Sequence, residues 1–303
     1  MKRAVVDVGS NSVLLLVSEL RDGAWVPIYE TSEVTSLGEG TKKSGLLGEP
    51  GMTSTLAAIA RAYEAARGLG VESIRAAATM AARIASNAAE FLARAEAQET
   101  PVYVLSGEDE AELGFRSVAD DPLFRYESRV SIIDVGGQST ELVTAQWDAE
   151  TSWEVVFRKS FPVGTLALRG GALNDESPDG LALLRASKEI DDALGLEYKP
   201  GEAGTAIALG ATGTNLVTIR EGMIKWEPDK VHGTWLGYEE VSRAVGWMSP
   251  MADAERAAIV GIEKGRERTI HIGSLILERF LYAIRAEGCR VSVRGWRHAL
   301  LES

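Results

Sequence analysis

A short motif that occurs twice constrains the fold of this chain more than any other feature. Residues 7–12 read DVGSNS and residues 134–139 read DVGGQS, so aspartate, valine, glycine and serine recur in register. In each copy an apolar run ends at the aspartate, small and polar residues follow, and a second apolar run begins. The repeat predicts two β-hairpins, each of which opens one half of an α/β chain.

Both turns have the composition of a phosphate-binding loop. Glycine lets the backbone approach a ligand closely, exposed N–H groups form an anion-binding nest, and serine or asparagine side chains add hydrogen bonds. An aspartate at the strand end beside such a nest suits a divalent cation that bridges phosphate oxygens. One such turn is common in proteins of any function. Its repetition predicts two homologous domains that face each other across a phosphate-binding cleft.

A third glycine-rich turn, GATGTN at residues 210–215, follows a short predicted strand and opens a predicted helix. Its unpaired N–H groups and the positive end of the helix dipole are suited to another anion. A capped helix with Thr212 or Thr214 as the N-cap explains the same residues. Both interpretations stay open at this point.

The remaining periodicity predicts short strands that alternate with helices. Strands are expected at residues 4–8, 12–18, 25–30, 73–78, 102–105, 130–135, 141–146, 154–158 and 205–209, and helices at residues 54–67, 80–98 and after 107. Pro122 interrupts the last helix because proline disfavours helical geometry in the residue before it. We therefore place the domains at residues 1–122 and 123–303.

Composition excludes several classes of protein. The net charge of −12 argues against a binder of nucleic acid polymers. Cys289 is the single cysteine, which excludes a disulfide framework and a thiolate zinc site and indicates a reducing, cytoplasmic compartment. We predict no signal peptide and no membrane span, because the apolar residues 272–284 are too few and better suit a core helix.

The charge is unevenly spread, since residues 256–303 hold nine Lys and Arg against five Glu. We expect this basic stretch to contact a long polyanionic substrate, above all through Arg266 and Arg268 in the polar segment 263–269. A solvated, arginine-rich helix face explains the charge equally well.

Taken together, the motifs resemble the exopolyphosphatase and guanosine pentaphosphate phosphatase family, Ppx/GppA, in the superfamily of acetate kinase, sugar kinases, Hsp70 and actin. The resemblance rests on DVGSNS and DVGGQSTELV and on SLGEG (36–40), ATMAARIASNAAEFL (78–92), LSGEDEAELGF (105–115), FPVGTLAL (161–168), GATGTN, SLILERF (274–280) and RVSVRGWRHALL (290–301). It implies an α/β fold of two actin-like (ribonuclease H-like) domains facing an interdomain cleft.

The resemblance also implies roles for individual residues. Glu110 is the general base, Asp134 and Glu141 hold a metal ion, and Asp7 stands near the same ion, for which Mg²⁺ is expected because the ligands are hard oxygens. The implied phosphate-binding residues are Gly9, Ser10, Asn11, Ser12, Arg83, Gly136, Gly137, Gln138, Ser139, Gly210, Thr212 and Gly213. Without the resemblance, an acidic helix N-terminus explains residues 108–112, and a solvated side chain explains Arg83.

The implied activity is Mg²⁺-dependent release of terminal orthophosphate from inorganic polyphosphate. Guanosine pentaphosphate is the alternative substrate, and a kinase of the same superfamily or a noncatalytic phosphate- or nucleotide-binding regulator are further alternatives. Gln138 replaces a usual glycine, and Glu112 and Ser36 replace usual arginines, and these three changes argue against long polyphosphate. Gln138 and Glu112 also favour the regulator. The sequence leaves open whether the chain forms a homodimer.

Overall fold

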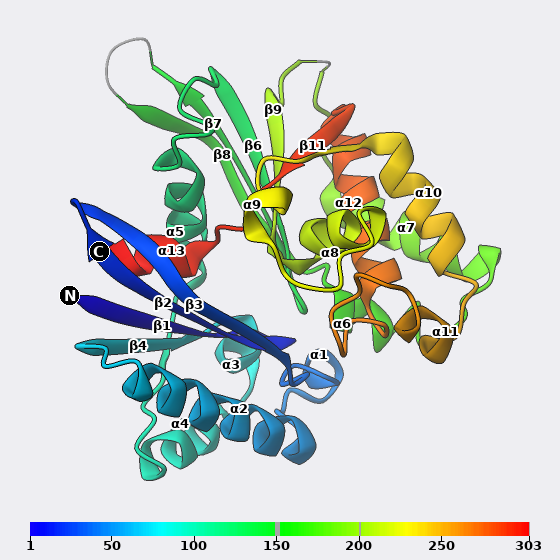
Figure 1. Ribbon diagram of the computed structural model, residues 1–303. Coiled ribbons are helices and arrows are strands. Elements are labelled where there is room, and N and C mark those ends of the chain that lie inside the picture. Colours follow the sequence, from blue (N-terminus) through cyan, green and yellow to red (C-terminus); the bar gives the residue numbers. More distant parts are fainter. Residues whose placement is uncertain (149–151, 200, 303) are drawn as a thin grey trace. The chain divides into compact units, whose positions relative to one another are not determined.

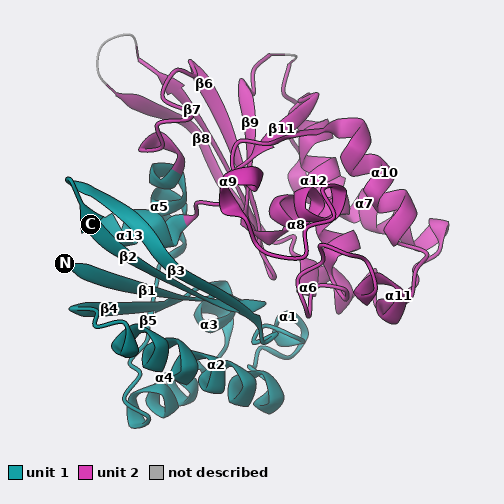
Figure 2. Ribbon diagram, in the orientation of Figure 1, with its two compact units in different colours: residues 1–117, 296–303 teal, residues 118–295 magenta. Residues whose placement is uncertain are grey.

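The computed structural model describes residues 1–148, 152–199 and 201–302. Contacts divide the chain into two compact units, unit 1 with residues 1–117 and 296–303 and unit 2 with residues 118–295 (Figure 2). Along the chain, unit 1 first gives way to unit 2 between residues 117 and 118, five residues before the expected boundary. The division differs from the expected domains at the C-terminus, where the last residues group with unit 1.

Unit 1 is built on a five-stranded sheet with the order β3-β2-β1-β4-β5 (Figure 1). Its strands are β1 Lys2–Val8, β2 Ser12–Arg21, β3 Ala24–Val34, β4 Ser73–Ala78 and β5 Tyr103–Val104. The first three strands pair antiparallel, whereas β4 is parallel to β1 and β5 is parallel to β4. The helices are α1 Thr41–Ser44, α2 Glu49–Gly68, α3 Met80–Ile84, α4 Ala88–Ala97, α5 Gly107–Ala119 and α13 Trp296–Glu302.

Unit 2 contains a six-stranded sheet with the order β10-β11-β9-β6-β7-β8. Its strands are β6 Arg129–Val135, β7 Thr140–Trp147, β8 Trp153–Phe161, β9 Thr205–Leu209, β10 Trp235–Gly237 and β11 Gly288–Val291. Its helices are α6 Thr165–Arg169, α7 Gly180–Leu194, α8 Gly210–Arg220, α9 Pro228–Val231, α10 Tyr238–Met248, α11 Asp253–Ala257 and α12 Ile270–Ala283.

The sequence repeat is also a structural repeat. The strands β3-β2-β1-β4 have the same order and directions as β8-β7-β6-β9. The register matches as well, because Asp7 lies opposite Leu14 as Asp134 lies opposite Glu141. The prediction of two equivalent hairpins is therefore confirmed.

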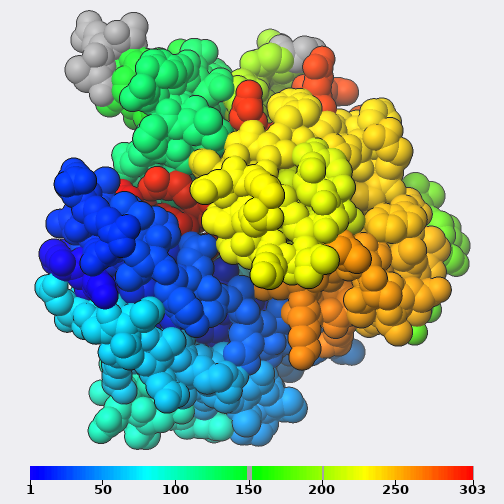
Figure 3. All heavy atoms as spheres, in the orientation of Figure 1, coloured from blue at the N-terminus to red at the C-terminus, as the bar shows by residue number. Residues whose placement is uncertain are grey.

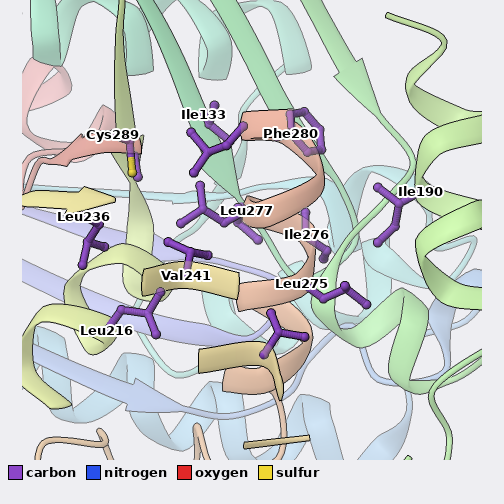
Figure 4. Close-up of a cluster of buried hydrophobic side chains, with 14 of the residues drawn as sticks. Ile133, Ile190, Leu216, Leu236, Val241, Leu275, Ile276, Leu277, Phe280 and Cys289 are labelled. Atoms are coloured by element: carbon purple, nitrogen blue, oxygen red, sulfur yellow. The ribbon is translucent and has the colours of Figure 1, made fainter. Parts of the chain in front are cut away.

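Helix α12 lies in the core of unit 2 (Figure 4). Ile276, Leu277 and Phe280 are fully buried, and Phe280 meets Phe161 of β8 edge to face with ring centroids 5.4 Å apart. Burial of each such side chain contributes about 1.5–3 kcal/mol of transfer free energy. The expected core helix at residues 272–284 is confirmed. None of the helices within the described ranges has the length and apolar character needed to cross a bilayer.

Cys289 on β11 lies in the same core (Figure 4). It is a free cysteine, and burial raises the pKa of its thiol to about 12. The thiol therefore stays protonated at neutral pH, and Cys289 acts as a small apolar side chain.

The expected helix over residues 80–98 is wrong, because the structure has two helices there. Ala85 is extended between α3 and α4, with ψ of 129°. Asn87 accepts a hydrogen bond from the N–H of Leu47 at 2.8 Å and donates one to its carbonyl oxygen at 3.0 Å. These distant bonds compete with the helical bonds of the chain and stabilise the break.

The C-terminal helix α13 belongs to the core of unit 1. Its residues Trp296, Leu300 and Leu301 pack with Val5, Leu16 and Ala77 of the sheet. Arg3 and Arg75 donate to the carbonyl oxygens of Leu301 and Leu300, both at 3.1 Å. The expected domain 123–303 assigns this helix to the second domain, whereas its contacts with the N-terminal strands place it in unit 1.

Candidate functional site: three glycine turns and an acidic helix start

The first glycine turn joins β1 to β2 in unit 1. The N–H of Gly9 donates to the carbonyl oxygen of Ser12 at 2.9 Å and closes the turn. The hydroxyl of Ser10 accepts a hydrogen bond from the N–H of Ala81 at 3.1 Å, and its carbonyl oxygen accepts one from Gly38 at 2.7 Å. Helix α3 and the SLGEG segment therefore hold the turn in a fixed shape.

The side chain of Asn11 in this turn has a hydrogen-bond donor that is not used within the described parts of the protein. Its side chain is buried, and its amide nitrogen Nδ2 has no hydrogen-bond partner among the described residues. A buried donor that lacks a partner costs about 1–3 kcal/mol. A phosphate oxygen that accepts a hydrogen bond from Nδ2 would remove this cost, and the phosphate-binding role of Asn11 stays a prediction.

The second turn joins β6 to β7 in unit 2 and is closed by the same bond, from the N–H of Gly136 to the carbonyl oxygen of Ser139 at 2.9 Å. Helix α6 begins directly on this turn, since the N–H of Leu166 donates to the carbonyl oxygen of Gly137 at 2.8 Å. Gly164 precedes the helix, and a Cβ there would lie 2.5 Å from the carbonyl carbons of Gly137 and Gln138. Only glycine allows this close approach.

Asp134 and Glu141 stand opposite each other on neighbouring strands beside the second turn. Directly opposed residues project to the same face of a sheet. Glu141 Oε1 accepts hydrogen bonds from the hydroxyls of Ser139 at 2.8 Å and Ser160 at 2.7 Å. The predicted metal-holding acids of unit 2 are therefore brought together.

Mg²⁺ fits this donor set. The described parts of the chain hold no group of three or more His, Cys, Asp or Glu residues arranged for a metal ion. Mg²⁺ does not require such a group, because it is commonly held by one or two carboxylates and completes its shell with water and substrate phosphates. Asp7 occupies the equivalent position on β1 of unit 1, and its approach to the same ion stays a prediction.

The third turn opens α8 immediately after β9. Gly210 has φ of 76°, and a Cβ there would lie 2.9 Å from Oδ1 of Asp134, so glycine is required for both reasons. Leu209 is the N-cap and supplies no side-chain bond. Thr212 and Thr214 lie inside the helix, so the alternative with either as N-cap is wrong. The first N–H groups of α8 lack a side-chain cap and are suited to an anion.

Glu110 lies in the first turn of α5 and is held by Arg83 of α3. Arg83 Nη1 donates to Glu110 Oε2 at 2.6 Å and to the carbonyl oxygen of Leu105 at 2.8 Å. Only 16% of the Glu110 side chain and 18% of the Arg83 side chain are exposed. The sequence predicted both residues for the site but not their ion pair, because their separation along the chain is no signal of contact.

Ser106 begins α5 and fixes the orientation of its first turn. Its hydroxyl accepts a hydrogen bond from the N–H of Asp109 at 3.0 Å and donates to the Asp109 carboxylate at 2.7 Å. Glu108 is exposed, whereas Glu110 points toward Arg83. The acidic helix start therefore contains both a solvated carboxylate and a carboxylate with a fixed cationic partner.

Comparison with known proteins decides the family. The model of the Ppx/GppA phosphatase family matches residues 16–303. The chain belongs to this family. Mycobacterium tuberculosis Exopolyphosphatase 1 is 28% identical over 99% of this chain and 87% of its own length, and Exopolyphosphatase 2 of that organism is 25% identical over 93% and 90%. The resemblance stated from the motifs, and the hydrolase class that it implied, are confirmed at the level of the family.

The fold is confirmed by a solved Ppx/GppA structure. The crystal structure of the Aquifex aeolicus family member matches with a TM-score of 0.79 and 28% identity, over 99% of this chain and 96% of the other. The Ppx/GppA chain described here therefore has the expected two-domain, actin-like α/β fold.

Proposed function

We propose that this Ppx/GppA protein is a Mg²⁺-dependent exopolyphosphatase, which releases terminal orthophosphate from inorganic polyphosphate. The observation that carries the proposal is the opposed pair Asp134 and Glu141 beside a glycine turn that closes like its partner in unit 1. This arrangement combines oxygen ligands for a cation with N–H donors for phosphate. The relatives named exopolyphosphatase support the choice of substrate.

The proposed chemistry is transfer of a terminal phosphoryl group to water. Glu110 accepts a proton from the attacking water, while Arg83 keeps its carboxylate in one orientation. Asn11 Nδ2 and the N–H groups of the glycine turns bind phosphate oxygens. Asp134 and Glu141 would hold a Mg²⁺ ion, which would neutralise negative charge on the substrate phosphates.

Gln138 is compatible with a catalytic role. Its side chain is 2% exposed, and the turn that contains it keeps the closing bond from Gly136 to Ser139. The second turn therefore closes with the same hydrogen bond as the first, although it contains glutamine. Guanosine pentaphosphate stays the alternative substrate, and a noncatalytic regulator stays the further alternative.

Replacement of the proposed base tests the function. Glu110→Gln should lower the turnover number for long polyphosphate by about a hundredfold or more, with little change in binding of the substrate. Glu108→Gln is the matched control, because Glu108 is exposed in the same helical turn and should leave turnover unchanged. Orthophosphate release gives turnover, and calorimetry gives binding. Equal turnover in the unmodified chain and Glu110→Gln would remove Glu110 from the mechanism.

A further inference from the structure

A loop of unit 2, residues 261–269, carries the two arginines that the sequence predicted for a long polyanion, Arg266 and Arg268. The loop lies between α11 and α12, and its segment, orange in Figure 3, reaches the surface of unit 2 beside the yellow segment. It contains no helix or strand, Arg268 is half-buried, and 12% of the Arg266 side chain is exposed. The contacts that hold the loop therefore decide where these cations point.

The first part of the loop is tied to the helix of the third glycine turn. Asn215 is buried in α8, and its Oδ1 accepts a hydrogen bond from the N–H of Glu263 at 2.8 Å. The hydroxyl of Thr218, one turn further along, donates to the carbonyl oxygen of Gly261 at 2.6 Å. Glu263 in turn accepts a hydrogen bond from Arg266 Nε at 2.9 Å.

The last part of the loop is tied to two arginines outside it. Arg169 Nη1 donates to the carbonyl oxygen of Arg268 at 3.0 Å, and Arg256 Nε donates to that of Glu267 at 2.6 Å. Asp253 joins the two arginines, since its Oδ2 accepts from Arg169 at 2.7 Å and its Oδ1 accepts from Arg256 at 2.5 Å. Arg256 is fully buried, so this network is part of the interior of unit 2.

Arg169 also connects the loop to the second glycine turn. It is the last residue of α6, a helix whose first N–H groups donate to the carbonyl oxygens of Gly136 and Gly137. Figure 1 shows α6, α8, α11 and the orange loop gathered in one part of unit 2. Helix α6 therefore contacts the second glycine turn at its first residues and the backbone of Arg268 through its last residue.

We propose that Arg169 and Asn215 are positioning residues, which fix the loop 261–269 relative to the second and third glycine turns so that Arg266 and Arg268 bind the polyphosphate chain beyond its terminal phosphates. This inference rests on the proposed function. A loop held in its binding conformation loses less conformational entropy when a ligand binds. Loss of either positioning residue therefore weakens binding of long substrates and has a smaller effect on tripolyphosphate.

The test compares Arg169→Gln with Arg279→Gln. Both arginines make a paired contact with one aspartate of unit 2, Arg169 with Asp253 and Arg279 with Asp191, but Arg279 does not contact the loop. We expect Arg169→Gln to raise the Michaelis constant for long polyphosphate by about fivefold or more at about 50 mM salt and by less at about 500 mM. Arg279→Gln should match the unmodified chain. An equal rise for long polyphosphate and tripolyphosphate would overturn the inference.

A combined variant separates positioning from general destabilisation. In a background with both Arg266→Ala and Arg268→Ala, Arg169→Gln should add little to the Michaelis constant, because the loop then has no arginine left to position. Independent, multiplying effects would contradict the proposed route through these two arginines. If Arg169→Gln fails to fold, Asn215→Ala must show the same dependence on chain length, and failure to do so overturns the inference.

Limited digestion with trypsin gives a readout that does not depend on activity. Arg169→Gln should be cut faster after Lys264, Arg266 and Arg268, as identified by mass spectrometry, while Arg279→Gln is cut at the rate of the unmodified chain. Unchanged cutting in Arg169→Gln would show that Arg169 does not hold the loop. If the unmodified chain neither binds nor hydrolyses polyphosphate, the proposed function fails, whereas faster cutting alone would still show that Arg169 holds the loop.

Discussion

At the scale of single residues, the surroundings of Asp134 and Glu141 explain how two carboxylates share one face of a sheet. Two serine hydroxyls donate to the same oxygen of Glu141, and Asp134 Oδ1 approaches Gly210 at the start of α8. Hydroxyls are neutral donors, so these two bonds orient the Glu141 carboxylate without adding positive charge to it. Carboxylate oxygens held in this way are the ligand type that Mg²⁺ prefers.

Replacement of Asp134 tests this assignment. Asp134→Asn should raise the Mg²⁺ concentration for half-maximal orthophosphate release by about tenfold, because an amide oxygen is a neutral and weaker ligand. Asp179→Asn is the control, since Asp179 caps α7 by accepting a bond from Ala182, which asparagine does equally well. A Mg²⁺ titration that is the same in all three proteins would make Asp134 a structural strand-end residue.

Burial of His271 should lower the free energy of unfolding in acid. It is fully buried in α12, and burial, aided by Arg256 and Arg169 and opposed by Asp253, lowers its pKa to about 3. The unfolded chain binds a proton at this histidine below its ordinary pKa of about 6.5, whereas the folded chain does not until about 3. The free energy of unfolding should therefore fall between these pH values as pH decreases.

His271→Leu should remove this loss. Between about pH 7.5 and pH 5 the histidine should account for about 2 kcal/mol of lost stability, from about 1.4 kcal/mol per pH unit below its unfolded pKa. Urea denaturation of the unmodified chain and of His271→Leu at both pH values gives the change in the free energy of unfolding for each protein. Titrating groups that the two proteins share contribute equally to both changes and cancel when they are compared. An equal fall in the two proteins would mean that His271 does not contribute.

At the scale of helices and strands, local patterns could be predicted and distant contacts could not. The two hairpins follow from apolar runs and a turn of small residues, all within neighbouring positions. The break between α3 and α4 depends on Asn87, whose partner Leu47 is 40 positions away. Nothing in the alanine-rich segment 80–98 signals that partner, so its helical propensity predicted one continuous helix.

The contact between α6 and the second turn leads to a prediction at this scale. Gly164→Ala should lower the free energy of unfolding by about 2 kcal/mol, because the new methyl group overlaps the backbone of Gly137 and Gln138. Gly180→Ala, at the start of α7 with no atom within 4 Å, is the control and should be neutral or slightly stabilising. Equal midpoints of urea denaturation in the two variants would contradict the close packing of α6 on the turn.

At the scale of the whole molecule, the two units contain equivalent hairpins whose turns carry different side chains. The turn of unit 1 is supported by Ser10 and offers the Asn11 amide, whereas the turn of unit 2 has the carboxylates Asp134 and Glu141 at its strand ends. The repeat of DVGSNS and DVGGQS predicted the two turns and their aspartates because the pattern lies in the chain itself, whereas Glu141 was expected from the family resemblance. The ion pair between Arg83 and Glu110 becomes visible only in the folded chain.

The C-terminal helix α13 also shows that sequence patterns do not predict which unit a segment joins. Trp296, Leu300 and Leu301 have the spacing of an amphipathic helix, but the apolar residues that receive them, such as Val5 and Ala77, lie more than 200 positions earlier in the chain. The boundary expected at residue 122 came from the local effect of proline, whereas contacts divide the units between residues 117 and 118, inside α5. The return of residues 296–303 to unit 1 depends on contacts with distant strands, and no pattern in the nearby sequence indicates it.

Orthophosphate release from one panel of substrates tests the central claim most directly. The unmodified chain should release orthophosphate from inorganic polyphosphate in the presence of Mg²⁺, more slowly from guanosine pentaphosphate and ATP, and from none of them when the metal is chelated. Release from guanosine pentaphosphate alone would move the assignment to the alternative substrate. Absence of release from every substrate with Mg²⁺ present, or transfer of phosphate to an acceptor other than water, would contradict the account.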